Sequence, residues 1–264
     1  MQQEQLDRLK RWFDEFSARY FGDDDYINTN LRLKKQHTWY VCQESLFLAD
    51  ELALDENQRR IAELIGLLHD VGRFPQFAQY RTFNDPRSVD HCRLGVEVLR
   101  SEGVLDVLSS EERQWVETAV ACHGRKTLPP DLRGQTLLHA KIIRDADKLD
   151  IFRVVVDAYR RYREDKKGFS FEIELPDVPE YTPEVLEAVQ QGRLIDYHLL
   201  RTLTDMKLCQ LSWVYDFNFV ASLKRLTERG YLQEIYAALP ETEPMTALQQ
   251  TIQDHVETKL RRGY

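Results

Sequence analysis

A histidine and an aspartate stand side by side at His69 and Asp70, inside the apolar stretch 67–73. This stretch ends a predicted buried helix, and Gly72 interrupts it two residues after the doublet. The doublet brings an imidazole and a carboxylate to one point, and groups with perturbed pKa values gather at functional sites. An isolated doublet is more often a helix end, with His69 as the C-terminal cap and Asp70 in a solvated turn. Its meaning therefore depends on the partners that the rest of the chain supplies.

Four further polar residues interrupt apolar helical faces or stand at their ends: His37, His91, His123 and Asp147. Each alone is typical of a buried or helix-end residue, but with the doublet they give four imidazoles and two carboxylates from neighbouring helices. These ligands suit Mn, Fe, Co, Ni or Zn, and the lack of thiolate ligands argues against a structural zinc cluster. Six ligands exceed what one catalytic metal uses while it keeps positions open for substrate. Two metals that share one carboxylate would use them well.

The elements that position these residues are helices, because apolar residues recur at three- and four-residue spacing along most of the chain. The expected helices cover about residues 4–21, 30–54, 55–68, 88 onward, 109–123, 136–163, 183–191, 194–211, 213–229 and 243–261. Residues 74–87 are expected to form a loop beside the doublet, with Tyr80 and Arg81 as candidate substrate contacts. The alternation in residues 169–175 is the only credible β signal. We therefore predict an all-α fold with at most one short β element near 169–175.

The 264-residue chain has an ordinary globular composition, with 42% hydrophobic and 30% charged residues and a formal charge of −8. An acidic surface repels nucleic-acid backbone, so nucleic-acid binding is disfavoured, whereas a small phosphorylated substrate needs only a local cluster of cations. No apolar run is long enough for a membrane span, and the N-terminus lacks the order of a signal peptide, so we expect a cytoplasmic protein. The scattered cysteines are expected to be reduced thiols. Cys92 and Cys122 are interpreted as small core residues that face away from the neighbouring histidines.

The order His, His-Asp, His, His, Asp resembles that of the HD-domain superfamily of metal-dependent phosphohydrolases. The local matches are residues 68–72 (LHDVG), 90–95 (DHCRLG) and 144–150 (RDADKLD). The resemblance implies an HD-domain helical bundle with additional N- and C-terminal helices. We expect one HD-type domain over residues 1–264, with its core at about 30–160 and a C-terminal helical extension at about 183–264.

In the binuclear members of this superfamily, the first histidine, the doublet and the final aspartate hold one metal, and the two middle histidines hold the other. The doublet aspartate bridges the two. The resemblance therefore assigns two divalent transition metals (Fe, Mn, Co, Ni or Zn) to this chain. The first would be held by His37, His69, Asp70 and Asp147, and the second by Asp70, His91 and His123. The chain departs from the HD-GYP cyclic-dinucleotide phosphodiesterases at Arg73, where they usually carry lysine, and it lacks their Gly-Tyr-Pro signature after His123.

The resulting hypothesis is hydrolysis of a small phosphoester, a nucleotide or another phosphorylated metabolite, by a metal-activated hydroxide. Asp70 is the expected catalytic bridge, and Arg73 is either a phosphate clamp or a plain surface arginine. Asp150 could orient a ligand, and Lys148 is expected to point away from the centre. Two alternatives stay open: a diiron oxygenase resembling myo-inositol oxygenase, because the same ligands suit both chemistries, and a non-catalytic regulatory protein that keeps the metal. The substrate and the oligomeric state do not follow from the sequence.

Overall fold

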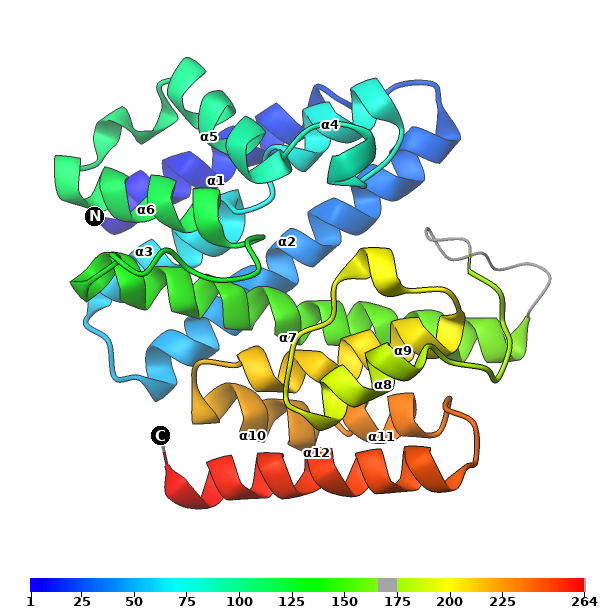
Figure 1. Ribbon diagram of the computed structural model, residues 1–264. Coiled ribbons are helices and arrows are strands. Elements are labelled where there is room, and N and C mark those ends of the chain that lie inside the picture. Colours follow the sequence, from blue (N-terminus) through cyan, green and yellow to red (C-terminus); the bar gives the residue numbers. More distant parts are fainter. Residues whose placement is uncertain (166–174, 264) are drawn as a thin grey trace. The chain divides into compact units, whose positions relative to one another are not determined.

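The fold is helical throughout residues 1–165 and 175–263, which the computed structural model describes (Figure 1). The predicted all-α class is confirmed, since no strand occurs in these residues. The β element expected near 169–175 falls outside the described residues, except for Leu175, which belongs to no regular element. The α-helices are α1 Gln3–Ala18, α2 Asp25–Glu51, α3 Glu56–Leu68, α4 Arg73–Tyr80, α5 His91–Ser101, α6 Ser110–Cys122, α7 Gly134–Glu164, α8 Pro183–Gln190, α9 Leu203–Ser212, α10 Val220–Glu228, α11 Tyr231–Tyr236 and α12 Glu243–Arg262. Short 3₁₀ helices are η1 Asp85–Arg87, η2 Val104–Val107, η3 Tyr197–Leu199 and η4 Trp213–Asp216.

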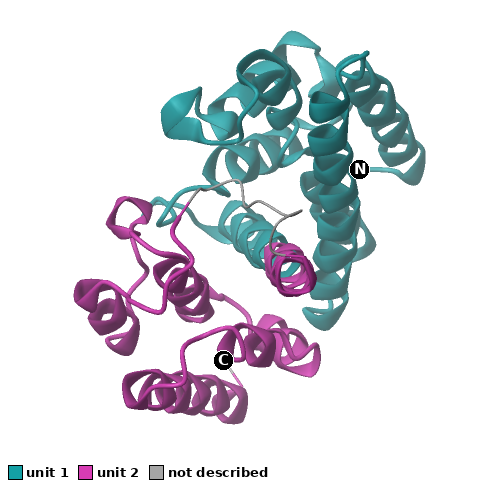
Figure 2. Cartoon of the chain, turned by 90° about the vertical axis from the view of Figure 1, so that its right-hand side faces the viewer, with its two compact units in different colours: residues 1–150 teal, residues 151–264 magenta. Residues whose placement is uncertain are grey.

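The chain divides into two compact units, residues 1–150 and residues 151–264, and the boundary falls inside α7 (Figure 2). Unit 1 contains α1 to α6 and the first half of α7, and so holds every residue of the predicted site. Unit 2 contains the rest of α7 and α8 to α12. The expectation of one domain over the whole chain stays a prediction. None of the described helices is long and apolar enough to cross a membrane.

Helix α2 begins earlier than the sequence pattern predicted. Asp24 is its N-cap, and the Asp24 carboxylate accepts a hydrogen bond of 3.1 Å from the backbone amide of Ile27. Asn28 donates from Nδ2 to the carbonyl of Gly22 at 2.7 Å, so it closes the preceding loop from inside the helix. The start at Asp25 places His37 in the middle of a long, continuous helix, where its position is set by packing rather than by a fraying end.

The prediction of a loop over residues 74–87 is wrong for its first half, because Arg73–Tyr80 is helix α4. Pro75 lies in the first turn, where a missing backbone N–H costs no intrahelical hydrogen bond. Phe74 and Phe77 are fully buried on one face, which stabilises this short helix. Its end at Arg81 has φ 57°, and Arg81 there forms an ion pair with Asp24. The turn therefore holds α4 against the start of α2.

Two glycines allow the close approaches that assemble unit 1. A Cβ at Gly66 would lie 3.0 Å from the Cα of Cys42, so α3 packs directly on the backbone of α2. A Cβ at Gly72 would lie 2.3 Å from the carbonyl oxygen of His91 and 2.6 Å from the amide nitrogen of Gly95. The turn after α3 therefore lies against the first turns of α5. These two close approaches place the His-Asp doublet next to α2 on one side and next to α5 on the other.

Unit 2 is built around α9, all of whose residues are buried. Thr202 caps this helix and Asp205 completes a capping box, while the Asp205 carboxylate also accepts a hydrogen bond of 2.7 Å from the amide of Thr182, before α8. Helices α8 and α11 pack on α9, and α12 packs on α8 and α10. The expected helix 194–211 is in fact η3 followed by α9, and α11 was not predicted, because its six residues are too few to show a period.

Candidate metal centre

All six predicted site residues lie together in unit 1. His37 comes from the middle of α2, and His91 is the first residue of α5. His69 and His123 are the C-caps of α3 and α6. Asp70 lies in the turn after α3, and Asp147 is on α7. The four histidines and Asp70 are buried, so their polar atoms depend on one another or on a bound ion.

Asp70 lies between two pairs of histidines. Its Oδ2 is 3.7 Å from Nε2 of His37 and 3.5 Å from Nε2 of His69. Its Oδ1 is 3.5 Å from Nε2 of His91 and 3.5 Å from Nε2 of His123. We call His37, His69, Asp70 and Asp147 the first subsite, and Asp70, His91 and His123 the second subsite. The two subsites share one carboxylate, and each uses a different oxygen of it.

Asp147 completes the first subsite. Its Oδ1 is 3.1 Å from Nε2 of His37 and 3.8 Å from Nε2 of His69. In the second subsite the Nε2 atoms of His91 and His123 are 3.1 Å apart. Ligands at 2.0–2.2 Å from one ion lie roughly 2.8–3.6 Å apart at octahedral or tetrahedral angles. The two separations of 3.1 Å fall within this range, and that between Asp147 and His69 is slightly longer.

Backbone carbonyls fix two of the four imidazoles. Nδ1 of His69 is 2.7 Å from the carbonyl oxygen of Gly66, and Nδ1 of His123 is 2.8 Å from that of Val120. A carbonyl only accepts hydrogen bonds, so each Nδ1 must carry the proton. Each Nε2 of the neutral ring then presents a lone pair toward the carboxylates, which is the tautomer that binds a metal.

Carboxylates fix the other two imidazoles. Nδ1 of His37 is 2.6 Å from Oδ2 of Asp150, and Nδ1 of His91 is 2.6 Å from Oδ2 of Asp85. Each subsite thus has one histidine held by a carboxylate and one held by a carbonyl. Asp150 was predicted as a possible orienting residue and lies where that role requires. Asp85 was not predicted, because its position depends on the path of residues 81–90 and not on any helical spacing.

The donor set fits a transition-metal ion. Nε2 of His69 is completely buried and has no hydrogen-bond partner among the described atoms. A buried acceptor without a partner is costly, and an ion bound to its lone pair would remove that cost. Imidazole and carboxylate are the ligands that Mn, Fe, Co, Ni and Zn accept. The six residues could therefore hold divalent metal ions, and the assignment of each residue as a ligand stays a prediction.

The electrostatics of the site favour the ionised carboxylates and a neutral His69. Burial raises the pKa of Asp70, but the nearby ammonium group of Lys34 and the neighbouring imidazoles outweigh it and hold that pKa well below its usual value. Burial likewise opposes ionisation of Asp147, yet its hydrogen bond to His37 and the neighbouring imidazoles lower its pKa. Burial lowers the pKa of His69. Near neutral pH the centre therefore has anionic oxygens and an uncharged ring nitrogen available to a cation.

Residues 36–151 match the family model described as HD domain. The match begins one residue before His37, ends one residue after Asp150 and includes all six predicted site residues. Residues 36–151 form an HD domain. HD domains as a class belong to a superfamily of metal-dependent hydrolases, most of them phosphohydrolases. No curated protein and no solved structure matches the chain.

Two cations border the shared carboxylate of the HD domain. Nζ of Lys34 is 2.7 Å from Oδ2 of Asp70 and lies 5.3 Å from the centre of the Phe83 ring. Arg73, the predicted phosphate clamp, has its Nε 3.5 Å from Oδ1 of Asp70. Its Nη1 donates to the carbonyl of Phe83 at 2.5 Å and to Oδ1 of Asp85 at 2.9 Å. Arg73 therefore holds in place the Asp85 carboxylate that contacts His91. Lys34 was not predicted as a site residue, although it precedes His37 by three residues on one helical face.

The expectation that Cys92 faces away from the histidines is wrong. Its Sγ is 3.4 Å from Nε2 of His91, 3.6 Å from Nδ1 of His123 and 3.9 Å from Nε2 of His123. The His123 ring lies close to the sulfur because the end of α6 packs across the first turn of α5, which contains Cys92. Burial raises the pKa of Cys92, but the two imidazoles outweigh burial and lower that pKa to about 6. Cys122 is buried and joins none of the metal-donor groups among the described residues.

Arg144 fixes the end of α6 relative to α7. It is buried, and its guanidinium donates to the carbonyl of His123 at 3.2 Å and to that of Lys126 at 3.3 Å. These bonds occupy carbonyls that a helix end leaves without partners. Lys148, expected to point away from the centre, donates to the carbonyl of Arg144 at 3.4 Å. Arg144 thus sets the distance between His123 and Asp147 without belonging to the donor set.

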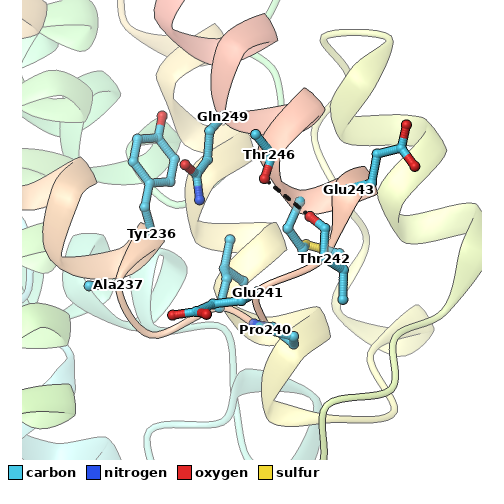
Figure 3. Close-up of a pocket in the computed structure, with 10 residues that line it drawn as sticks. Tyr236, Ala237, Pro240, Glu241, Thr242, Glu243, Thr246 and Gln249 are labelled. Carbon is cyan, nitrogen blue, oxygen red and sulfur yellow. Dashed lines mark hydrogen bonds between the residues drawn. The ribbon is translucent and has the colours of Figure 1, made fainter.

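Two further features lie outside the metal centre. His139 is completely buried, neither of its ring nitrogens has a hydrogen-bond partner, and its ring stacks on Trp115 at 5.8 Å between centroids. Burial lowers the pKa of His139 to about 4. In unit 2, a cavity of about 530 Å³ opens between the end of α11 and the start of α12, beside Tyr236 and Glu241 (Figure 3). None of the metal-donor groups found in the described part of the chain lies at this cavity.

Proposed function

We propose that this HD domain hydrolyses the phosphoester bond of a small molecule, a nucleotide or another phosphorylated metabolite. The proposal rests chiefly on one observation: Asp70 lies between two histidine pairs, each about 3.5 Å from one of its oxygens. This arrangement favours two neighbouring divalent transition-metal ions over one. Paired divalent ions are typical of phosphatases and phosphodiesterases. The prevalence of phosphohydrolases among HD domains supports the same choice.

His37, His69, Asp70 and Asp147 would hold the first ion, and the second subsite would hold the other. When bound, the metals would supply a water whose pKa is lowered from ~15.7 toward neutrality, and they would polarise a phosphoryl oxygen. The protein's own part is positional. The four fixed Nδ1 atoms keep the imidazoles oriented before any substrate arrives, and burial of the carboxylates limits competition by bulk water.

Lys34 and Arg73 are the proposed contacts for the phosphate. Lys34 combines a flexible stem with a side chain that is 21% exposed, and it forms an ion pair with Asp70. Ions bound at Asp70 would compete with this ammonium group and so release it toward an anionic substrate. Arg73 is more constrained, since Nη1 is already bound to Asp85, but its Nε has no hydrogen-bond partner. A phosphoryl group that carries two or more negative charges would be met by both cations.

The alternatives remain distinguishable by experiment. A diiron oxygenase would use the same imidazoles and carboxylates, so donor chemistry alone does not separate it from a hydrolase. A regulatory protein would need the metal but no cations near it. The net charge of −8 supports a small substrate over a long polyanion.

The test is a phosphate-release screen on metal-free protein reconstituted separately with Mn²⁺, Fe²⁺, Co²⁺, Ni²⁺ or Zn²⁺. Nucleotides and sugar phosphates are the substrates, and oxygen consumption is recorded in parallel. We expect phosphate release by the wild-type protein, its loss in Asp70→Ala, and retention in Lys148→Ala as the matched control. Oxygen consumption without phosphate release from any ester, or full activity in Asp70→Ala, would contradict the proposal.

A further inference from the structure

Gln76 is a completely buried polar residue on α4 that belongs to neither subsite. Its side-chain amide lies between Arg73 on the same helix and the segment 85–89, which leads to His91 of the second subsite. We propose that Gln76 is a positioning residue, which holds the Asp85 carboxylate against the ring of His91 and so fixes the second subsite before a metal ion binds. This inference rests on the two subsites of the proposed function and adds a residue that controls one of them.

The orientation of the Gln76 amide follows from two of its partners. Oε1 of Gln76 accepts a hydrogen bond of 2.9 Å from Nη1 of Arg73, which can only donate. Nε2 of Gln76 donates at 2.9 Å to the carbonyl of Val89, which can only accept. A flipped amide would place its donor against the guanidinium and its acceptor against the carbonyl. Only one orientation is therefore compatible with both contacts.

In this orientation the amide reaches the carboxylate that supports the second subsite. Nε2 of Gln76 donates to Oδ1 of Asp85 at 2.8 Å, and Oδ2 of the same carboxylate is 2.6 Å from Nδ1 of His91. Nε2 also donates at 2.9 Å to Oγ of Ser88, whose hydroxyl donates to the carbonyl of Asn84 at 2.8 Å. With the carbonyl before α5, two amide hydrogens serve three acceptors, so at least one hydrogen is shared. Gln76 thus fixes both the carboxylate and the backbone of the segment that leads to His91.

Asp85 needs this support because its own surroundings are partly open. The Asp85 side chain is 31% exposed and belongs to η1, a 3₁₀ helix of three residues. Water can compete for a carboxylate in such a position, and the imidazole that it orients would then be free to turn. Gln76 is 0% exposed, so its amide is shielded from that competition. Arg73 also donates to Oδ1 of Asp85 at 2.9 Å, but it is a proposed phosphate contact, and Gln76 is the donor that does not also serve the substrate.

The consequence is specific to one subsite. In the first subsite, Nδ1 of His37 is held by Asp150 and Nδ1 of His69 by the carbonyl of Gly66, and both groups lie outside this network. Loss of the Gln76 amide should therefore weaken metal binding in the second subsite and leave the first almost unchanged.

The test is stepwise titration of metal-free protein with Zn²⁺ against a chromophoric chelator, for the wild-type protein, Gln76→Met, Asp85→Asn and the double variant. Methionine keeps the length of the glutamine side chain without its amide. We expect Gln76→Met to raise the same dissociation constant as Asp85→Asn, by roughly 3- to 10-fold. The double variant should bind no more than about twofold more weakly than Asp85→Asn, because Gln76 acts through Asp85. Gln79→Met, at an exposed glutamine of α4, is the matched control and should bind both ions like the wild-type protein.

Three results would overturn the inference: an unchanged constant in Gln76→Met, equal weakening of both subsites, or a double variant in which the two single effects multiply. If Gln76→Met does not fold, hydrogen exchange in the metal-free wild-type protein decides instead. The side-chain amide hydrogens of Gln76 should exchange with deuterium oxide at least roughly tenfold more slowly than those of Gln79, because they are buried and hydrogen-bonded. Equal exchange rates would also overturn the inference.

These outcomes are distinct from a failure of the proposed function. If the wild-type protein binds fewer than two zinc ions, the paired centre is refuted, and both the proposed function and this inference fail with it. If it binds two ions and any of the contrary results above is found, only the role of Gln76 is refuted.

Discussion

Replacing Asp150 by asparagine should weaken metal binding in the first subsite and leave the second almost unchanged. The carboxylate of Asp150 is 2.6 Å from Nδ1 of His37 and is 1% exposed. Asparagine can still accept the hydrogen bond through its oxygen, so the ring orientation should survive. The substitution removes the negative charge that would make Nε2 of His37 a stronger electron-pair donor to a metal ion.

The size of the effect follows from the role of such partners in metal sites. Loss of a residue that supports a ligating histidine typically costs 10- to 100-fold in metal affinity, or about 1.4–2.7 kcal/mol. Asp150 should lie near the upper limit, because its charge is buried. Asp85→Asn should weaken the second subsite nearer the lower limit. The Asp85 side chain is 31% exposed, and its other oxygen is shared with Arg73 and Gln76.

The assay is stepwise metal titration of the wild-type protein and both variants against a chromophoric chelator, which yields two dissociation constants for each protein. We expect Asp150→Asn to raise one constant and Asp85→Asn to raise the other. Equal weakening of both sites by either variant would refute the division into two subsites. No effect of either variant would refute the supporting role of these carboxylates.

Three other predictions concern the fold, the substrate and pH. Gly72→Ala places a Cβ about 2.3 Å from the carbonyl of His91, so thermal unfolding should show a loss of about 1–3 kcal/mol. Lys34→Met should lower kcat/KM for a phosphoester roughly 10- to 100-fold at unchanged metal content. Lys35→Met, which removes a partly exposed ion pair with Asp14, should leave kcat/KM unchanged. An equal loss of kcat/KM in both variants would contradict the role of Lys34. Since burial lowers the pKa of His139 to about 4, from about 6.5 for an ordinary histidine, its contribution to stability is complete above about pH 6.5 and falls toward pH 4. In urea titrations of metal-free protein, His139→Phe should flatten this fall by up to about 1.4 kcal/mol per pH unit, and an unchanged slope would contradict it.

The helical class and the meeting of the six site residues could be predicted from the sequence. Their spacing relative to apolar stripes placed His37 on a buried face, and the ends of those stripes placed His69 and His123 at helix termini. Such positions carry information because a polar residue on a buried stripe needs a partner. Only six such residues were found, and their order along the chain was enough to indicate that they belong to one site.

The remaining features depend on packing that no local pattern encodes. Cys92 was expected to face the core, yet its direction is set by where α6 ends against α5. Asp85 reaches His91 through a short irregular segment. Residues 74–87 were predicted to be a loop, although the first turn of α4 tolerates Pro75. Lys34 is different: its three-residue spacing from His37 was visible in the sequence. Attention to charged residues on the same helical face would have found it.

The central claim is that Asp70 joins two metal subsites, and metal content measures it most directly. Elemental analysis of wild-type protein, reconstituted and then freed of excess metal, should return two divalent ions per chain. Asp70→Ala should lose both, because each subsite uses one oxygen of this carboxylate. At most one ion per chain in the wild-type protein, or two ions retained in Asp70→Ala, would contradict the shared centre.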